Sequence, residues 1–362
     1  MKSKFLCNLF AFILLVSPCL AIADEGDVQI SGFFFSTMFS QSDWYSNRSD
    51  AVINLDYTND TNAVRVQVSD AKTGEVRRIT YSRDFQINKN IESELTIGRF
   101  SRVSSFGDNI TDIPTNAGMA MLPQSGYNYR MYTGSFVLMD GMQSKTKWYS
   151  DDAITTLVYA FGDMTIYNQK SLNQEIFKTL NTNVNVKTVP HSIDIALHYE
   201  TKNVHLYTAL SEYHAKLEAA NTSRIALATV ASYSNIRYAI AKVGAKYQAE
   251  NWYIQSEIFE GETKTVSATG IEKVMTSAID YNYVLGYDIA ENYNLYAGQS
   301  HGMNRTANTE SRESFVGVIR YNLPWTIALQ YNYGHTNGAW RDYLSTVTNI
   351  RSAIVTVVYN FQ

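Results

Sequence analysis

Apolar and polar residues alternate one by one along much of this chain, and this period of two constrains the fold more than any other feature. Clear examples are the segments 53–58, 64–69, 192–199, 278–287, 327–333 and 355–361. Successive side chains of a β-strand point to opposite faces, so each segment predicts a strand with one apolar face and one polar face. No stretch shows a convincing 3.6-residue apolar stripe over three turns. The pattern therefore predicts an all-β protein.

The composition supports two different surfaces. Only 18% of the residues are charged, yet the mean hydropathy is −0.22, because Ser, Thr, Asn, Gln and Gly take the place of Lys and Glu. The formal net charge of −4 argues against a nucleic-acid binder, and the aromatic content of 13% argues against disorder. Two cysteines are too few for a disulfide scaffold or a zinc ribbon.

The first 23 residues have the pattern of a secretory signal peptide. Lys2 and Lys4 precede the apolar stretch 9–16, and the small-residue motif Ala21-Ile22-Ala23 follows it. We expect cleavage after Ala23, so that 1–23 is the signal peptide and 24–362 is the exported domain. Both cysteines then leave with the signal.

The exported part contains no apolar run that could form a transmembrane helix. Its longest run, Leu157–Phe161, has five residues, whereas a spanning helix needs about 20. Alternation also fits a soluble β-sandwich, but three features favour a closed transmembrane antiparallel β-barrel. The apolar faces end in Tyr or Trp, the opposite faces are polar throughout, and the connections come in two lengths.

The connections predict about sixteen strands. Short turns are expected at 59–62, 88–90, 150–152, 201–203, 249–251, 288–292 and 322–324. Longer outer connections are expected at 41–50, 100–130, 162–191, 212–237, 260–274, 301–312 and 334–350, with a short one at 70–74. The apolar segment 225–230 could be a further strand, but it would break this order, so we assign it to a loop or to a strand extension.

Short motifs then connect the barrel to a known family. The stretch 95–100 ends in Gly98-Arg99-Phe100, and about thirty loop residues follow, among them Asp108 and Asp112, before the polar strand 141–149. This order resembles the sixteen-stranded general porins of Gram-negative outer membranes, which carry a Gly-Arg at the start of the third outer loop. The segment 286–296 and the aromatic C-terminal strand are similar to late strands of the same family.

The resemblance implies a water-filled channel narrowed by the third outer loop, in which acidic loop residues face a basic wall. Carried onto this chain, it makes Arg99 a wall residue and Asp108 and Asp112 the acidic loop residues. Alternation adds four bases on the lumen face: Arg65, Arg78, Lys145 and Lys147. Alternation also puts Arg99 on the face of Leu95 and Ile97, unless the strand has broken there. The two aspartates could be turn residues, and the two lysines could lie near the periplasmic rim.

The family further implies a homotrimer in the Gram-negative outer membrane, surrounded by lipids and lipopolysaccharide. Its function would be passive diffusion of ions and small hydrophilic solutes, without a cofactor. We expect no metal site, no nucleic-acid partner and no enzymatic activity.

Three other functional classes remain as alternatives. A substrate-selective porin, for example one for oligosaccharides, would use an aromatic track, and Tyr207 and Tyr253 are the tyrosines that alternation places on the polar face. A barrel hydrolase would need a positioned histidine, and His198 and His205 lie on polar faces of adjacent strands, without a G-x-S-x-G nucleophile motif. A soluble periplasmic or surface β-protein is the third alternative.

Overall fold

A computed structural model describes most of the expected barrel. The described residues are 26–41, 44–69, 76–101, 138–165, 184–188, 192–219, 235–266, 271–306, 308–322, 324–336 and 349–361. The proposed signal peptide 1–23 and the segment 225–230 lie outside them.

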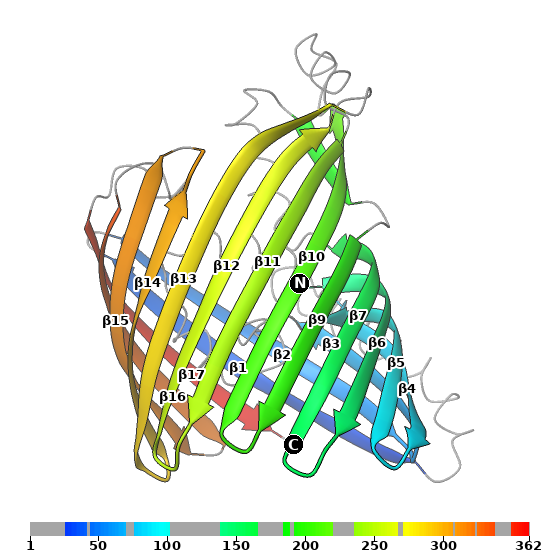
Figure 1. Ribbon diagram of the computed structural model, residues 1–362. Coiled ribbons are helices and arrows are strands. Elements are labelled where there is room, and N and C mark those ends of the chain that lie inside the picture. The colour runs from blue at the N-terminus through cyan, green and yellow to red at the C-terminus, as the bar shows by residue number, and fades with distance from the viewer. Residues whose placement is uncertain are drawn as a thin grey trace, which may run out of the picture.

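The described chain is built from β-strands joined by turns (Figure 1). They are β1 (Asp27–Gln41), β2 (Trp44–Thr58), β3 (Asn62–Ser69), β4 (Val76–Asn88), β5 (Ile91–Ser101), β6 (Leu138–Tyr149), β7 (Ala153–Thr165), β8 (Val184–Thr188), β9 (Ser192–Thr201), β10 (Val204–Ala219), β11 (Asn235–Gln248), β12 (Trp252–Val266), β13 (Glu272–Ala290), β14 (Tyr293–Asn304), β15 (Thr309–Asn322), β16 (Trp325–Thr336) and β17 (Asn349–Phe361). Among the described residues, no helix is both long and apolar enough to cross a membrane.

The long strands form a closed antiparallel barrel of sixteen strands, as the alternation predicts. Each long strand pairs with the next one along the chain, and β7 pairs directly with β9. The ring closes where β1 pairs with β17, from Gly32 opposite Phe361 to Gln41 opposite Ser352. Closure gives each of these sixteen long strands a neighbour on both sides, so the barrel itself has no open edge.

The seven short turns of the sequence prediction are confirmed, since each falls between two strands that end and begin there. Three of them are closed by backbone hydrogen bonds, from Asn59 N to Asn62 O, from Ser150 N to Ala153 O and from Ala249 N to Trp252 O. The turns lie together at the lower end of the barrel (Figure 1).

At the other end the strands run further than the sequence predicts. The expected loop 41–50 is mostly strand, because β2 begins at Trp44, and the expected loop 212–237 is shortened by β10 and β11. In β2 the added residues 44–50 do not alternate, so hydropathy gives no sign of them. In β10 the alternation continues along 212–216, but its apolar residues, Tyr213 and Ala215, are buried on the inner face and the polar ones lie on the outer face.

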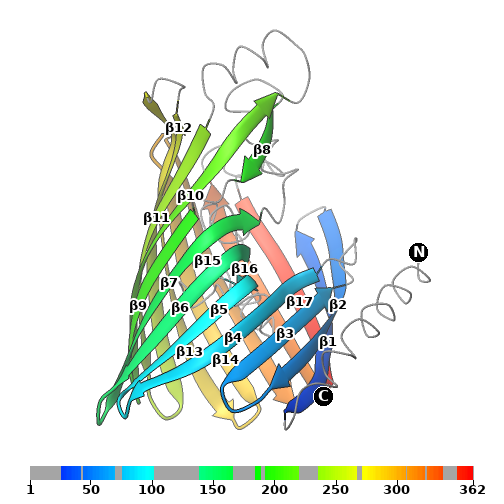
Figure 2. The same cartoon turned by 90° about the vertical axis from the view of Figure 1, so that its right-hand side faces the viewer.

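The extended strands make one side of the barrel taller than the other. The wall formed by β10 to β13 rises above the wall formed by β3 to β5 in both views (Figures 1 and 2). The short strand β8, which the sequence did not predict, pairs with Ala215–Ala219 at the far end of β10.

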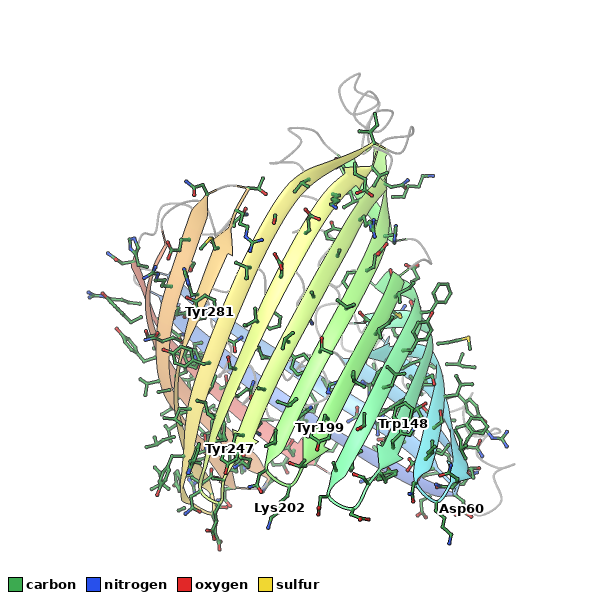
Figure 3. The ribbon with its side chains drawn as sticks, in the orientation of Figure 1. Asp60, Trp148, Tyr199, Lys202, Tyr247 and Tyr281 are labelled. Carbon is green, nitrogen blue, oxygen red and sulfur yellow. The ribbon has the colours of Figure 1, made fainter. Side chains whose placement is uncertain are left out.

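The outer face of the barrel is apolar, with aromatic rings toward its ends. Trp148, Tyr199 and Tyr247 lie near the turns, whereas Tyr281 lies higher on the wall (Figure 3). Along β16, Ile327 and Leu329 lie between Trp325 and Tyr333, and all four are exposed. Eight positions of strand span roughly 26 Å, or about 20 Å of height after strand tilt, close to the apolar band of an outer-membrane barrel.

Candidate pore wall

Cross-strand contacts identify the inner face. The Tyr207 hydroxyl of β10 donates a hydrogen bond to Glu257 Oε1 of β12 (2.6 Å), which takes the ring across Gly244 of β11. Likewise, Tyr296 of β14 donates to Gln330 of β16 (2.9 Å). Such bridges over a whole strand suit the concave side of a barrel, so the residues that alternate with the exposed apolar ones face the lumen.

Two of the five wall bases predicted from the sequence lie on β3 and β4. Arg65 Nε donates to Asp56 Oδ1 of β2 (2.5 Å), and the Arg65 side chain is 50% exposed. Arg78 is opposite Gln67, which itself donates to Asn54 (2.9 Å). Their neighbours in register are polar, while Ile79 and Tyr81 point the other way and are exposed, so both arginines lie on the inner face.

Lys145 and Lys147 lie on the inner face of β6, each opposite a glutamate of β5. Lys147 Nζ is 3.4 Å from Glu92 Oε1, and the Tyr149 hydroxyl donates to the other oxygen of Glu92 (2.8 Å). Lys145 pairs in register with Glu94. Lys147 lies three residues before the turn at Ser150, so this cluster is near the lower rim.

These acidic partners were missed from the sequence. Asp56, Glu92 and Glu94 are an even number of positions away from the other inward-facing polar residues of their strands, that is, they have the same parity. Alternation alone could therefore have placed them on the lumen side. The described wall is therefore not a ladder of bases: it carries cations interleaved with carboxylates.

Arg99 takes a different position from the other bases. It lies opposite Ile79 in register, and Ile79 is exposed on the outer face. Its guanidinium donates twice to Asp140 of β6, from Nε to Oδ1 (2.6 Å) and from Nη2 to Oδ2 (2.7 Å). Because β5 continues without a break to Ser101, Arg99 lies on the same outer face as Leu95 and Ile97. This position argues against a place on the lumen wall.

Gly98 explains how the Gly-Arg pair fits into β5. Its φ of +123° is readily adopted only by glycine, and an added Cβ would collide with the carbonyl oxygen of Ile79. The motif that supports the resemblance thus marks a close approach of two strands. Asp108, Asp112 and the expected third outer loop from residue 102 onward lie outside the described residues, whereas residues 100 and 101 still belong to β5.

On the strands β10, β12 and β14, inward-facing tyrosine rings pack against the backbone of the neighbouring strand. Tyr207 rests on Gly244, Tyr253 on Gly286, and Tyr296 on Gly317. Tyr207 is 3% exposed and Tyr253 is 8% exposed, which confirms that both face inward, as their alternation predicts. They pack into the wall and do not stand out from it as a track.

Acidic side chains accompany these rings. Asp280 of β13 and Glu313 of β15 are 1% and 2% exposed. Around the ring of sixteen, β13 is opposite β4 and β15 is opposite β6, eight strands away in either direction. The strands bearing Arg78 and Lys145 therefore face the strands that bear Asp280 and Glu313.

Solved structures with the same architecture include an outer-membrane protein and a porin. The OmpT outer-membrane protein of Vibrio cholerae matches with a TM-score of 0.60 and 14% identity, over 94% of this chain and 99% of that chain. An anion-selective porin from Comamonas acidovorans gives 0.59 and 10%, over 93% and 100%. Salmonella typhi OmpF in complex with daunomycin gives 0.58 and 12%, over 92% and 97%.

The sequence comparisons gave no match. No protein-family model and no curated protein matches this chain. The structural likeness shows the fold: the chain has the closed barrel of the general outer-membrane porins, as its sequence predicts.

Proposed function

We propose that this chain forms a water-filled channel in the outer membrane for passive diffusion of ions and small hydrophilic solutes. The observation that carries the proposal is the closed ring of sixteen strands, apolar outside, with accessible charges inside. Arg65, Lys147 and Glu92 keep 50%, 30% and 30% of their side-chain surface exposed. A lumen with such groups is wet, and fixed charges in a narrow pore influence which ions pass.

Arg65, Arg78, Lys145 and Lys147 are the bases that we assign to the pore wall. Asp108 and Asp112 remain the proposed acidic residues of the constriction, by the family resemblance alone. Arg99 is left out, because its register and its pairing with Asp140 place it on the outer face.

Single-channel recording in a planar bilayer tests the proposal. The folded protein, identified by heat-modifiable migration in a detergent gel, should give stepwise conductance increases. In a salt gradient, the double variant Lys145→Gln with Lys147→Gln should move the reversal potential toward greater cation preference, since it leaves Glu92 and Glu94 uncompensated. Lys202→Gln, in an exposed turn (Figure 3), is the matched control. Folded protein that never conducts would refute the channel.

A substrate-selective porin is the second candidate, favoured by the inward-facing rings of Tyr207, Tyr253 and Tyr296. Their burial argues for a structural role. Block of the conductance by one oligosaccharide, removed by Tyr253→Ala, would favour the selective channel.

We further propose a homotrimer in the outer membrane, in contact with lipids and lipopolysaccharide, exported by a signal peptide cleaved after Ala23. One solved form of the Vibrio cholerae protein is described as a trimer, with a TM-score of 0.60 and 13% identity. Mass photometry of the detergent-solubilised protein should give three times the chain mass, and N-terminal sequencing should begin at Asp24.

A further inference from the structure

The hairpin of β9 and β10 brings two histidines and a glutamate together on the inner wall. His198 and Glu200 are two positions apart on β9, and His205 lies opposite Glu200 on β10, so the three side chains share one face. His198 Nδ1 is 3.0 Å from His205 Nε2, and that nitrogen is 3.5 Å from Glu200 Oε1. One ligand atom from each residue lies within 4.8 Å of the other two.

We propose that His198, Glu200 and His205 form a binding site for a transition-metal ion such as Zn²⁺. Around a tetrahedral zinc ion with bonds of about 2.0–2.1 Å, neighbouring ligand atoms are roughly 3.3 Å apart. The two separations of 3.0 and 3.5 Å lie on either side of that value. The ligand atoms of the third pair, His198 and Glu200, lie within 4.8 Å of each other, so they would have to approach by at most about 1.5 Å.

The donor set determines which metals suit the site. Two imidazole nitrogens and one carboxylate oxygen are a zinc ligand set found in proteins, and imidazole also suits Cu²⁺ and Ni²⁺. Ca²⁺ and Mg²⁺ prefer oxygen ligands alone, so they should bind poorly here. A fourth position would be filled by water, since the side chains of His205 and Glu200 remain 29% and 46% exposed.

The surroundings hold the site in place. The Tyr207 ring stacks on His198 with 5.6 Å between ring centroids and 25° between planes. The charged group nearest in register on β11 is Lys246, opposite His205, and its Nζ lies 5.1 Å above the Tyr253 ring. On β7, the neutral Thr156 lies opposite His198. The stacking on Tyr207 and the contact with His205 orient the imidazole of His198 before any ion arrives.

Metal binding to the folded, untagged protein in detergent tests this proposal. Equilibrium dialysis against Zn²⁺, with metal and protein both quantified, should show saturable binding of one ion per chain. His198→Gln and His205→Gln should each weaken that binding by more than about tenfold, since even the loss of a group that only supports a ligand costs about that much. Glu200→Gln should weaken it less, because the amide oxygen can still coordinate. His335→Gln, which removes an exposed imidazole near the barrel rim, should leave it unchanged.

A second measurement distinguishes coordination of the metal ion at this site from nonspecific binding of metal to the protein surface. Co²⁺ in a four-coordinate site with nitrogen ligands should give visible absorption bands that disappear in His198→Gln. Binding that His198→Gln and His205→Gln leave unchanged, or the absence of saturable binding to protein that migrates as folded, would overturn the proposal. Neither readout requires the barrel to conduct, so this result is independent of the channel experiment.

Discussion

Replacing Gly244 with alanine should destabilise the barrel more than any ordinary Gly→Ala change in a strand. An added Cβ would lie 2.8 Å from Cδ1 of Tyr207 and closer still to Cε1. The ring has little room to move, because it stacks on His198 on one side and its hydroxyl is held by Glu257. Both Tyr207 and Glu257 are 3% exposed, so a displaced ring would leave a buried carboxylate without this donor.

The size of the effect follows from two terms. Overpacking a well-filled site costs about 1–3 kcal/mol, and a hydrogen bond to a charged group is worth about 1.5–3 kcal/mol. We therefore expect Gly244→Ala to lower the free energy of unfolding by about 3–5 kcal/mol. Tyr207→Phe keeps the ring and loses only the hydroxyl, so it should lose about 1.5–3 kcal/mol.

Urea unfolding of the protein in lipid vesicles, followed by tryptophan fluorescence, measures these differences. The control is a double-mutant cycle with Tyr207→Ala, in which Gly244→Ala no longer meets a ring and should cost little. The coupling energy between the two sites should then be at least about 2 kcal/mol. The same loss in both backgrounds, or a Gly244→Ala protein within about 0.5 kcal/mol of wild type, would refute the packing argument.

Three further changes test the pore wall and its support. Lys147→Gln alone should raise cation preference by less than the double change with Lys145→Gln, which reversal potentials in a salt gradient can resolve. Asp108→Asn with Asp112→Asn should shift selectivity toward anions, and unchanged selectivity would remove both aspartates from the constriction. Gly98→Ala should destabilise the barrel by at least about 1–3 kcal/mol, because its φ lies in the left-handed region; urea unfolding at wild-type concentrations would contradict this.

The sequence predicted the barrel because the membrane imposes the same rule on every strand. Val64 and Ile79 had to face outward and Arg65 and Arg78 inward, and the structure places them so. The seven short turns were predictable for a related reason, since polar turn residues interrupt the alternation where the strands leave the membrane. In the upper part of β12, residues 260–265, neither face carries a large apolar residue, so the hydropathy signal disappears there. In the upper part of β10 the alternation persists with its apolar residues, such as Tyr213, on the inner face, which is the reverse of the pattern lower in the strand.

The charge pairs could not be predicted in the same way. Parity assigns Lys147 and Glu92 to the lumen, but which residues meet depends on the register between β5 and β6. The motif match assigned Arg99 to the pore wall, whereas its own parity pointed outward, and the register agrees with the parity. The Gly-Arg motif shows only that the sequence is similar to that of other proteins at this point. Side-chain alternation follows from the geometry of the strand, so it is the better predictor of the direction of Arg99.

The order of residues was enough to tell which face of each strand is apolar and outward and which is polar and inward, because side-chain direction in a strand depends only on position. Which residues become neighbours on those faces is visible only in the folded barrel: Tyr207 lies above Gly244, and His198 lies against His205 with Glu200 beside them. Those neighbours depend on how far each strand slides past the next, which the residues of one strand do not specify. Stagger and closure around all sixteen strands fix that register, and with it the chemistry that the inner wall can perform.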